Sequence, residues 1–387
     1  MSSMSFPEPD YMADEEIRMF HDSVGRFLDQ SVDQKRIAKW REDGQVERGF
    51  WREAGAAGLL GVSVPEEYGG HGGDFRHDLV VVDQVHRKEI EGFGASLHNV
   101  IVTPYIRLHG TEEQKKRWLP NLVTGERVAA IAMSEPGAGS DLQAIRTTAL
   151  KDGNGYRING SKTFISNGQV ADLIVVVAKT DPSLGARGIS LLVVETSEVE
   201  GFRRGQNLDK IGNEAQDTSE LFFDDVWVPS ENLLGLEEGN GFLQLMSELP
   251  RERLLIAINA VTTMEHALAV TVDYVKERKA FGQTVFDFQN TQFKLAEMYA
   301  KARIAKTFIN DCTAKAIAGT LDNTTSAIAK LWATDTEWEI VDQCLQLHGG
   351  YGYINDYPIA RMFRNSRISR IYGGSNEIMK VLIARSL

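Results

Sequence analysis

Residues 171–180 read ADLIVVVAKT, and three further runs of the same character lie near them. They are YRINGSKTFISNG at 156–168, GISLLVVET at 188–196 and SELFFDDVWVP at 219–229. β-Branched and aromatic residues dominate these runs, while Gly, Asn and Asp separate them, which is typical of short strands in an antiparallel sheet or barrel. The sequence therefore predicts an antiparallel β-barrel-like domain in the middle of the chain, over residues 126–236.

Helical patterns flank this middle part on both sides. Upstream, residues 13–29 and 76–91 carry apolar side chains three and four positions apart, and Thr111 is placed to cap a helix that begins with two acids. Downstream, long helical patterns cover residues 253–279, 289–318, 325–347 and 376–386. The predicted fold class is α+β in three domains: an N-terminal helical domain (1–125), the β domain (126–236) and a C-terminal helical bundle (237–387).

Composition narrows the classes of function. The net charge of −12 argues against a broad nucleic-acid-binding face, because such faces present basic side chains to phosphates. The two cysteines, Cys312 and Cys344, lie in apolar helical stretches without metal-ligand spacing, so we expect buried free thiols and no metal. No run of about 18 apolar residues predicts a membrane span. The acidic first residues lack targeting features, which favours a cytoplasmic location.

Residues 131–144, IAMSEPGAGSDLQA, form a glycine-rich segment that could lie against a ligand. Gly137 and Gly139 allow close approach of the backbone, and Ser134 and Ser140 offer hydroxyl donors. The segment has neither the lysine of a P-loop nor the spacing of a dinucleotide-binding fingerprint. Taken alone, it is a weak signal and is more typical of an ordinary glycine-rich hairpin.

Together with three distant segments, this loop resembles the acyl-CoA dehydrogenase family, and most closely its long-chain and isovaleryl branch. The segments are ERKAFGQTVFDFQ at 277–289, QLHGGYGYINDYPIARMFRN at 346–365 and IYGGSNEI at 371–378. Their order and spacing follow the family over nearly the whole chain. The resemblance implies FAD as cofactor, an acyl-CoA thioester as substrate, electron-transferring flavoprotein as partner and a homo-oligomer, usually a tetramer.

The resemblance also implies which residues contact FAD. Phe164 stands where many members have tryptophan, and it keeps an aromatic face for the flavin ring. Arg278 and Gln289 match residues that reach the FAD of a neighbouring subunit, where an arginine can hold a pyrophosphate with two donors. The complete implied set is Ile131, Met133, Ser134, Gly139, Ser140, Phe164, Ile165, Ser166, Arg278, Gln289, Gln346, Leu347, His348, Gly349, Gly350, Ser375, Asn376 and Glu377.

The family removes the α proton and the β hydride of the thioester, so a base is needed. Most members carry a catalytic glutamate where this chain has Gly373, which has no side chain. The long-chain and isovaleryl branch places the base just before an arginine on an earlier helix, and here Glu252 precedes Arg253. The resemblance therefore implies Glu252 as the base. It implies substrate contacts at Ser140, Arg253, Gly373 and Gly374.

Several alternatives remain open at this point. Glu252 could be a charge in the first turn of a helix that starts at Pro250, and Glu248 would meet the same chemical need. Arg253 could form a surface ion pair with either glutamate. His348 and Glu135 are expected to be local structural elements.

The reaction and its substrate also leave alternatives. An acyl-CoA oxidase-like enzyme, or an inactive flavin-containing binding protein, would share these motifs. The missing side chain at Gly373 is expected to leave room for a long or branched acyl chain.

Overall fold

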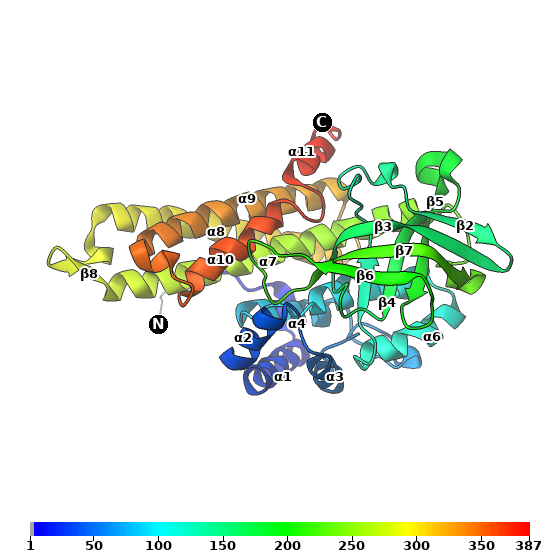
Figure 1. Cartoon of the computed structure of the whole chain (residues 1–387). Helices are drawn as coiled ribbons and strands as arrows, with labels where there is room; N and C mark the ends of the chain where they lie inside the picture. Colours follow the sequence, from blue (N-terminus) through cyan, green and yellow to red (C-terminus); the bar gives the residue numbers. More distant parts are fainter. Residues whose placement is uncertain (1–3) are drawn as a thin grey trace.

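The computed structural model describes residues 4–387 and confirms the predicted order of helices, strands and helices. Figure 1 shows a long helical bundle extending from the β domain, with the N-terminal helices packed against both. The domain limits between residues 125 and 126 and between residues 236 and 237 remain predictions from the sequence. The start of the bundle lies beside the sheet, while its other end projects away from the sheet. Residues at the two ends of the bundle therefore lie far apart within the chain.

The N-terminal domain is built from six α-helices around a core of large aromatic side chains. They are α1 Glu15–Ser31, α2 Gln34–Asp43, α3 Arg48–Ala56, α4 Phe75–Arg87, α5 Thr103–His109 and α6 Glu112–Val123. Trp40, Phe50 and Trp51 are buried in their core. The predicted cap at Thr111 is confirmed: its hydroxyl accepts from Gln114 N, and the Gln114 side chain accepts from Thr111 N.

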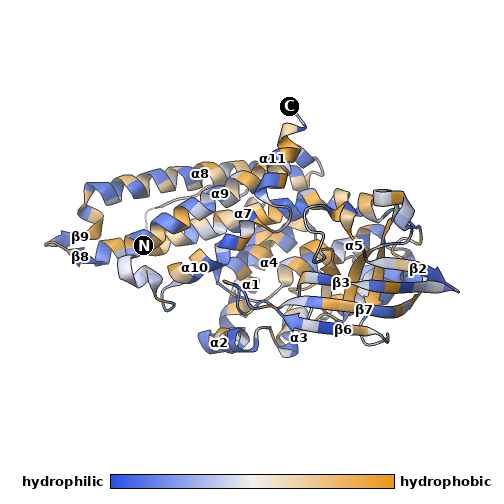
Figure 2. Cartoon of the chain, turned by 45° about the horizontal axis from the view of Figure 1, so that its top comes forward, coloured by the Kyte–Doolittle hydropathy of each residue, from blue (hydrophilic) through white to orange (hydrophobic). Residues whose placement is uncertain are grey.

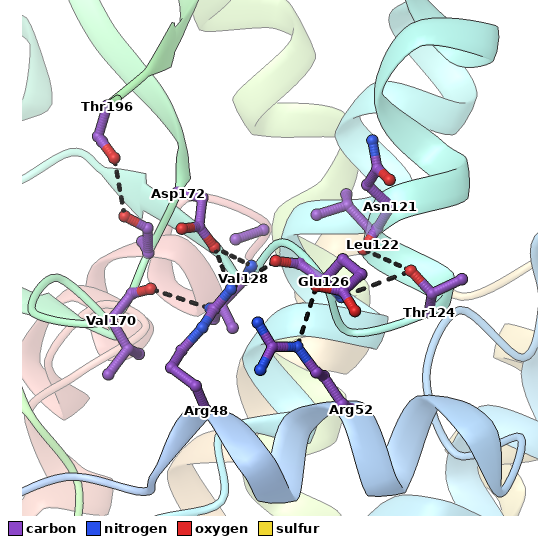
Figure 3. Close-up of polar contacts among 12 residues, drawn as sticks. Arg48, Arg52, Asn121, Leu122, Thr124, Glu126, Val128, Val170, Asp172 and Thr196 are labelled. Carbon is purple, nitrogen blue, oxygen red and sulfur yellow. Dashed lines mark hydrogen bonds and ion pairs between the residues drawn. The ribbon is translucent and has the colours of Figure 1, made fainter. Parts of the chain in front are cut away.

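Two arginines of α3 fasten the N-terminal domain to the β domain (Figure 3). Arg48 forms an ion pair with Asp172 at 2.7 Å and donates to the carbonyl of Val170 at 3.2 Å. Arg52 donates to Glu126 at 2.9 Å. Asp172 also accepts from Val128 N at 2.8 Å. Because the partners lie at the edge of the sheet and in the segment that enters it, these contacts set the angle between the two domains.

The β domain is one seven-stranded sheet. Its strands are β1 Ala129–Ala132, β2 Thr148–Asp152, β3 Gly155–Ser166, β4 Leu173–Lys179, β5 Ile189–Glu195, β6 Phe202–Asn207 and β7 Thr218–Pro229. The order is β1-β4-β2-β3-β7-β6, and β5 pairs with β4. The predicted sheet is confirmed, except that β4 runs parallel to both β1 and β2. Parallel pairing is possible here because neither of these strands is joined to β4 by a hairpin.

The bundle contains α7 Gly241–Glu277, α8 Gln289–Ile317, α9 Asn323–His348, α10 Pro358–Ser366 and α11 Asn376–Ala384, with a short hairpin of β8 Lys279–Ala280 and β9 Gln283–Thr284. Along α8 and α9, hydrophobic and hydrophilic stretches alternate (Figure 2), as expected for helices with one face in a core. Cys312 and Cys344 are buried free thiols, as predicted.

The helix α7 differs from its prediction at its start. It begins at Gly241 and continues through Pro250, whereas the sequence pattern predicts a start near residue 253. Within residues 4–387, α7 alone is long and apolar enough to cross a membrane by length and composition, but 72% of its most apolar window is buried in the protein. Its apolar side chains are therefore explained by its place in the bundle.

Candidate active site

The first part of the site lies where β1 leaves the sheet and β3 ends. Thr163 N donates to the carbonyl of Ser134 at 3.0 Å, which joins the glycine-rich loop to the end of β3. Phe164 has a φ of +61° and is 68% exposed, unusual for an aromatic residue on a strand. Its ring is therefore presented to solvent beside Ser134 rather than packed in the core. A β-carbon at Gly137 or Gly139 would meet nothing within 4 Å, so the loop leaves open space for a ligand.

A buried ion pair holds this loop from behind. Lys162 Nζ donates to Glu135 Oε1 at 2.9 Å and to the carbonyl of Met133 at 3.0 Å. Glu135 also accepts from the backbone N–H groups of Arg146 and Thr147, at 2.6 and 3.0 Å. The structural role expected for Glu135 is confirmed by these contacts. Burial lowers the pKa of Lys162 to about 8, although the neighbouring carboxylate of Glu135 acts in the opposite direction.

Glu252 lies inside α7 with its carboxylate almost completely enclosed. The residue is 6% exposed, and Oε1 accepts a hydrogen bond from Tyr105 Oη of α5 at 2.9 Å. Burial raises the pKa of Glu252 to about 7, while the bond from Tyr105 and the charges of Arg251 and Arg253 act to lower it. A carboxylate with a pKa near neutrality can accept a proton and release it again at physiological pH.

Glu248, one turn earlier on α7, has different partners. It is 5% exposed, forms an ion pair with Arg251 and lies 3.4 Å from His109 Nε2. Burial acts to raise the pKa of Glu248, but His109, Arg251 and Ser247 together lower it below its usual value. Because its charge is already neutralised by these groups, Glu248 is a poorer proton acceptor than Glu252.

Two of the alternative interpretations of this region are wrong. Glu252 is not in the first turn of a helix, because α7 begins at Gly241 and Pro250 lies within it. Arg253 is not part of a surface ion pair, because it is 5% exposed and donates a hydrogen bond to Asn323 Oδ1 at 3.3 Å. Its Nε is buried without a partner. The orientation of Arg253 toward α9 could not be read from its neighbours in sequence.

The segment that carries Gly373 lies against the same part of α7. Gly373 and Gly374 have φ values of +63° and +88°, a left-handed conformation that strongly favours glycine. A β-carbon at Gly373 would lie 2.4 Å from Cδ1 of Ile256, which is one turn after Glu252. The expectation that the missing side chain leaves free room is therefore wrong at the β-carbon position, where Ile256 fills the space.

The other residues near the start of α11 divide into two kinds. Ser375 caps the helix by accepting from Ile378 N, and Glu377 lies in its first turn. The Asn376 side chain is 1% exposed and bonds inward to α9, so only its backbone is available to a ligand.

A second group of expected cofactor residues gathers at the opposite end of the bundle. Arg278, together with residues 346–350, lines a cavity of about 460 Å³. His348 stacks on Tyr274 with ring centroids 4.3 Å apart, and its Nδ1 lies 2.8 Å from the carbonyl of Cys344, as expected for a local structural element. Gln289, at the start of α8, is not among the residues lining this cavity.

The two groups belong to opposite ends of one elongated chain. Figure 1 places the β8–β9 hairpin, which follows Arg278, at the end of the bundle farthest from the sheet. Phe164 and the glycine-rich loop lie on the sheet itself. The two groups of expected cofactor residues therefore lie far apart within one chain (Figure 1).

Tyr105 and Lys162 were not identified from the sequence. Tyr105 stands in the apolar stretch before His109 and is separated from Glu252 by 147 positions, so no local pattern indicates their contact. Lys162 lies in a predicted strand, where a lysine is normally solvated. In residues 4–387, no three His, Cys, Asp or Glu side chains are gathered to hold a metal ion.

Comparisons with known proteins cover the whole arrangement. Models of the acyl-CoA dehydrogenase N-terminal, middle and C-terminal domains match residues 14–126, 130–226 and 239–387. The long-chain specific acyl-CoA dehydrogenase of Sus scrofa is 46% identical over 371 residues, covering 95% of this chain and 86% of that protein.

Two solved structures extend the comparison to three dimensions. An acyl-CoA dehydrogenase from Geobacillus kaustophilus has a TM-score of 0.95 and 48% identity, with 98% of this chain and 99% of that chain covered. An acyl-CoA dehydrogenase complexed with FAD from Bacillus anthracis has a TM-score of 0.90 and 31% identity, covering 99% and 68% of the two chains.

Proposed function

The chain belongs to the acyl-CoA dehydrogenase family, and we propose that it dehydrogenates an acyl-CoA thioester with Glu252 as the base for the α proton. It is an oxidoreductase of this family, and its cofactor is FAD. The single observation that carries the assignment of the base is the enclosed Glu252 carboxylate, whose pKa is raised to about 7 by burial. Glu337 of α9 is also buried with a pKa raised to about 7, but its Oε2 accepts from Ser369 Oγ at 2.7 Å, whereas Glu252 lies one turn from Ile256, the side chain that meets Gly373.

The residues present fit FAD. The open loop at Gly137 and Gly139, the hydroxyls of Ser134 and Ser166 and the exposed face of Phe164 would hold its flavin end. Arg278 and residues 346–350 would hold the adenosine end from a second copy of the chain. When bound, FAD supplies the acceptor for the β hydride. This division of the site supports a homo-oligomer, for which we propose a tetramer.

The protein's own part in the reaction is to bind, orient and remove a proton. Glu252 accepts the α proton on its carboxylate, and Tyr105 holds Oε1 so that the other oxygen faces the substrate. As the proton leaves, negative charge develops on the thioester oxygen, and the backbone N–H groups of the Gly373–Gly374 turn would act as its donors. Enclosure of Glu252 excludes water, which keeps the carboxylate a strong base.

The substrate is proposed to be a long or branched acyl chain. The support is the 46% identity to a long-chain relative, together with the shared pattern of Glu252 and Gly373. Electron-transferring flavoprotein is the proposed electron acceptor, and slow reduction of oxygen by the loaded enzyme would separate this from the oxidase alternative. The proposed location is the cytoplasm.

The test is anaerobic bleaching of the flavin by a panel of short, long and branched acyl-CoAs. Glu252→Gln should keep its FAD and slow bleaching by about 10² to 10⁴-fold, the usual contribution of a general base. Glu248→Gln is the matched control, and it should stay within about tenfold of wild type, or about 1.4 kcal/mol in the barrier.

Near wild-type bleaching by Glu252→Gln, or a larger loss in Glu248→Gln, would show that Glu252 is not the base. A strong preference for short straight chains would contradict the proposed substrate. If no acyl-CoA bleaches the wild-type flavin, the inactive binding protein becomes the better description.

A further inference from the structure

Lys330 of α9 is a fully buried lysine with no acidic partner. The residue is 0% exposed, and its Nζ donates to the carbonyl of Gly374 at 2.9 Å and to Asn376 Oδ1 at 2.8 Å. Among residues 4–387, no carboxylate oxygen lies within ion-pair distance of this ammonium group. The acids Asp335 and Glu377 act on it only without direct contact, and enclosing a charge that has no direct ion pair is costly, so its presence calls for a role beyond packing.

One neutral acceptor of Lys330, the carbonyl of Gly374, belongs to the turn at Gly373 and Gly374, and the other, Asn376, is the first residue of α11. Two consecutive glycines in the left-handed region have more conformational freedom than any other residue pair, so this turn has little intrinsic stiffness. Two other polar side chains of α9 contact the elements on either side of the turn and not the turn itself: Asp335 pairs with Arg370 at 2.7 Å, and Thr334 accepts from Asn376 of α11 at 3.0 Å. Lys330 is the α9 side chain that hydrogen-bonds to the turn itself, at the carbonyl of Gly374.

The opposite side of the turn meets α7. Ile256 lies against Gly373, and Ile256 is one turn from Glu252 along the same helix. A shift of the turn away from α7 would therefore change the distance between the Gly373 backbone and the carboxylate of Glu252. With Lys330 on one side and Ile256 on the other, the turn has one position relative to the base.

We propose that Lys330 is a positioning residue for the dehydrogenation, which holds the Gly373–Gly374 turn against α7 beside Glu252. This inference rests on the proposed function, because the position of the turn matters only if the turn contacts the thioester. Lys330 acts through the backbone of Gly374 and does not itself touch the substrate. Its ammonium group also adds positive charge behind the turn, on the side away from α7.

A second buried cation strengthens the electrostatic part of the argument. Arg253 is 5% exposed and hydrogen-bonds to Asn323, which lies on α9 two turns before Lys330. Neither cation pairs with an acid. When the proton moves to Glu252, the negative charge moves to the thioester oxygen, and both cations remain in place to stabilise it.

The experiment compares three variants of the FAD-loaded enzyme. Lys330→Met removes the hydrogen bonds and the charge while keeping most of the volume. Lys330→Gln removes the charge but keeps a donor for the turn. Thr334→Val, one helical turn later, is the matched control, because it removes a hydrogen bond to the same Asn376 and leaves Lys330 intact.

Three quantities are measured for each variant: kcat and KM with acyl-CoA, FAD per subunit, and hydrogen exchange of the backbone amides of 371–376. Lys330→Met should lower kcat by about 10 to 100-fold, the effect of misplacing a catalytic group by about 1 Å. Its KM and FAD content should change by less than about threefold, a difference under 1 kcal/mol.

Hydrogen exchange of Lys330→Met should rise in residues 371–376 and stay unchanged in the 133–140 loop, which Lys162 holds. Lys330→Gln should fall between Lys330→Met and wild type, and Thr334→Val should keep a kcat near that of wild type.

An unchanged kcat in Lys330→Met would overturn the inference. So would a loss of kcat in which all three variants fall equally and exchange rises in both loops, because a general loss of stability would then explain the result. If Lys330→Met does not fold, the comparison of Lys330→Gln with Thr334→Val decides by the same criteria. Failure of the proposed function looks different, since the wild-type enzyme itself would then not be bleached by acyl-CoA.

Discussion

Glu248 and Glu252 are the same residue type, one turn apart on α7, and are 5% and 6% exposed. Their pKa values nevertheless move in opposite directions: that of Glu248 is lowered and that of Glu252 is raised to about 7. Glu248 has Arg251 and His109 beside it, whereas the Glu252 carboxylate accepts its hydrogen bond from the neutral hydroxyl of Tyr105.

The difference shows that burial alone does not make a base. Burial disfavours the charged form of both glutamates and so acts to raise both pKa values. The groups beside each carboxylate decide whether its pKa is raised or lowered in the end. A carboxylate with a cation beside it is held as an ion, while one with a single neutral donor is free to take a proton. The predictions that follow alter these partners one at a time.

The largest expected effect comes from removing the cation beside Glu248. Arg251→Met should destabilise the protein by about 3–5 kcal/mol, because breaking a buried pair leaves an uncompensated charge. It should also raise the pKa of Glu248, and that of Glu252, because the charge of Arg251 acts on both carboxylates. Thermal unfolding of the FAD-loaded enzyme at pH 8 measures the loss. If the melting temperature is unchanged, Arg251 is not what separates the two glutamates.

The second prediction is that Glu252→Gln and Glu248→Gln change the free energy of unfolding in opposite directions. The folded pKa of Glu252, about 7, exceeds its unfolded value, so its contribution to stability is present below about pH 4.5 and is lost as the pH rises through 7. At pH 8, Glu252→Gln should therefore raise the free energy of unfolding, by about 3 kcal/mol at 1.36 kcal/mol per pKa unit. This gain should shrink toward pH 5.

Glu248→Gln should do the opposite. Its folded pKa is lowered, so its contribution is present above the unfolded pKa and is lost only as the pH falls through the folded value. At both pH 5 and pH 8 the variant should be less stable than wild type. Urea unfolding at the two pH values measures both variants, and equal signs would remove the distinction between the glutamates.

The smallest expected effect concerns the remaining partner of Glu252. Tyr105→Phe removes a hydrogen bond to the ionised carboxylate, worth about 1.5–3 kcal/mol, and should raise the pKa of Glu252 further. The acid limb of kcat/KM should then move upward by about one to two pH units. His109→Ala is the control, because His109 contacts Glu248 and should leave this limb in place. An unmoved limb in Tyr105→Phe would mean that another group controls it.

Much of the fold was predictable because its signals are local. The β-branched runs, the N-cap at Thr111 and the apolar helical patterns each depend on neighbours within a few positions. The start of α7 was missed for the same reason, since Pro250 is a local signal of a helix start that tertiary packing overrides. The parallel pairing of β1 with β4 depends on strands more than 40 positions apart, which no local pattern encodes.

The candidate site was predictable to a lesser degree. Resemblance to a family was enough to single out Glu252, Gly373 and the glycine-rich loop by residue type and order. It did not indicate Tyr105, which reaches Glu252 from another domain, or Lys330, which reaches Gly374 from another helix. It also led to the expectation of free space at Gly373, where the structure has Ile256.

The amino-acid sequence by itself determined the order of the domains and the family. It also determined that Glu252 precedes Arg253 and that Gly373 stands where most family members carry the catalytic glutamate. The tertiary structure alone decided what surrounds that base: a neutral donor for Glu252, a cation for Glu248 and a buried lysine behind the glycine turn. The physical reason is that residue type and periodicity are properties of neighbours in the chain. The pKa of a carboxylate and the position of a turn depend on groups brought together across the fold.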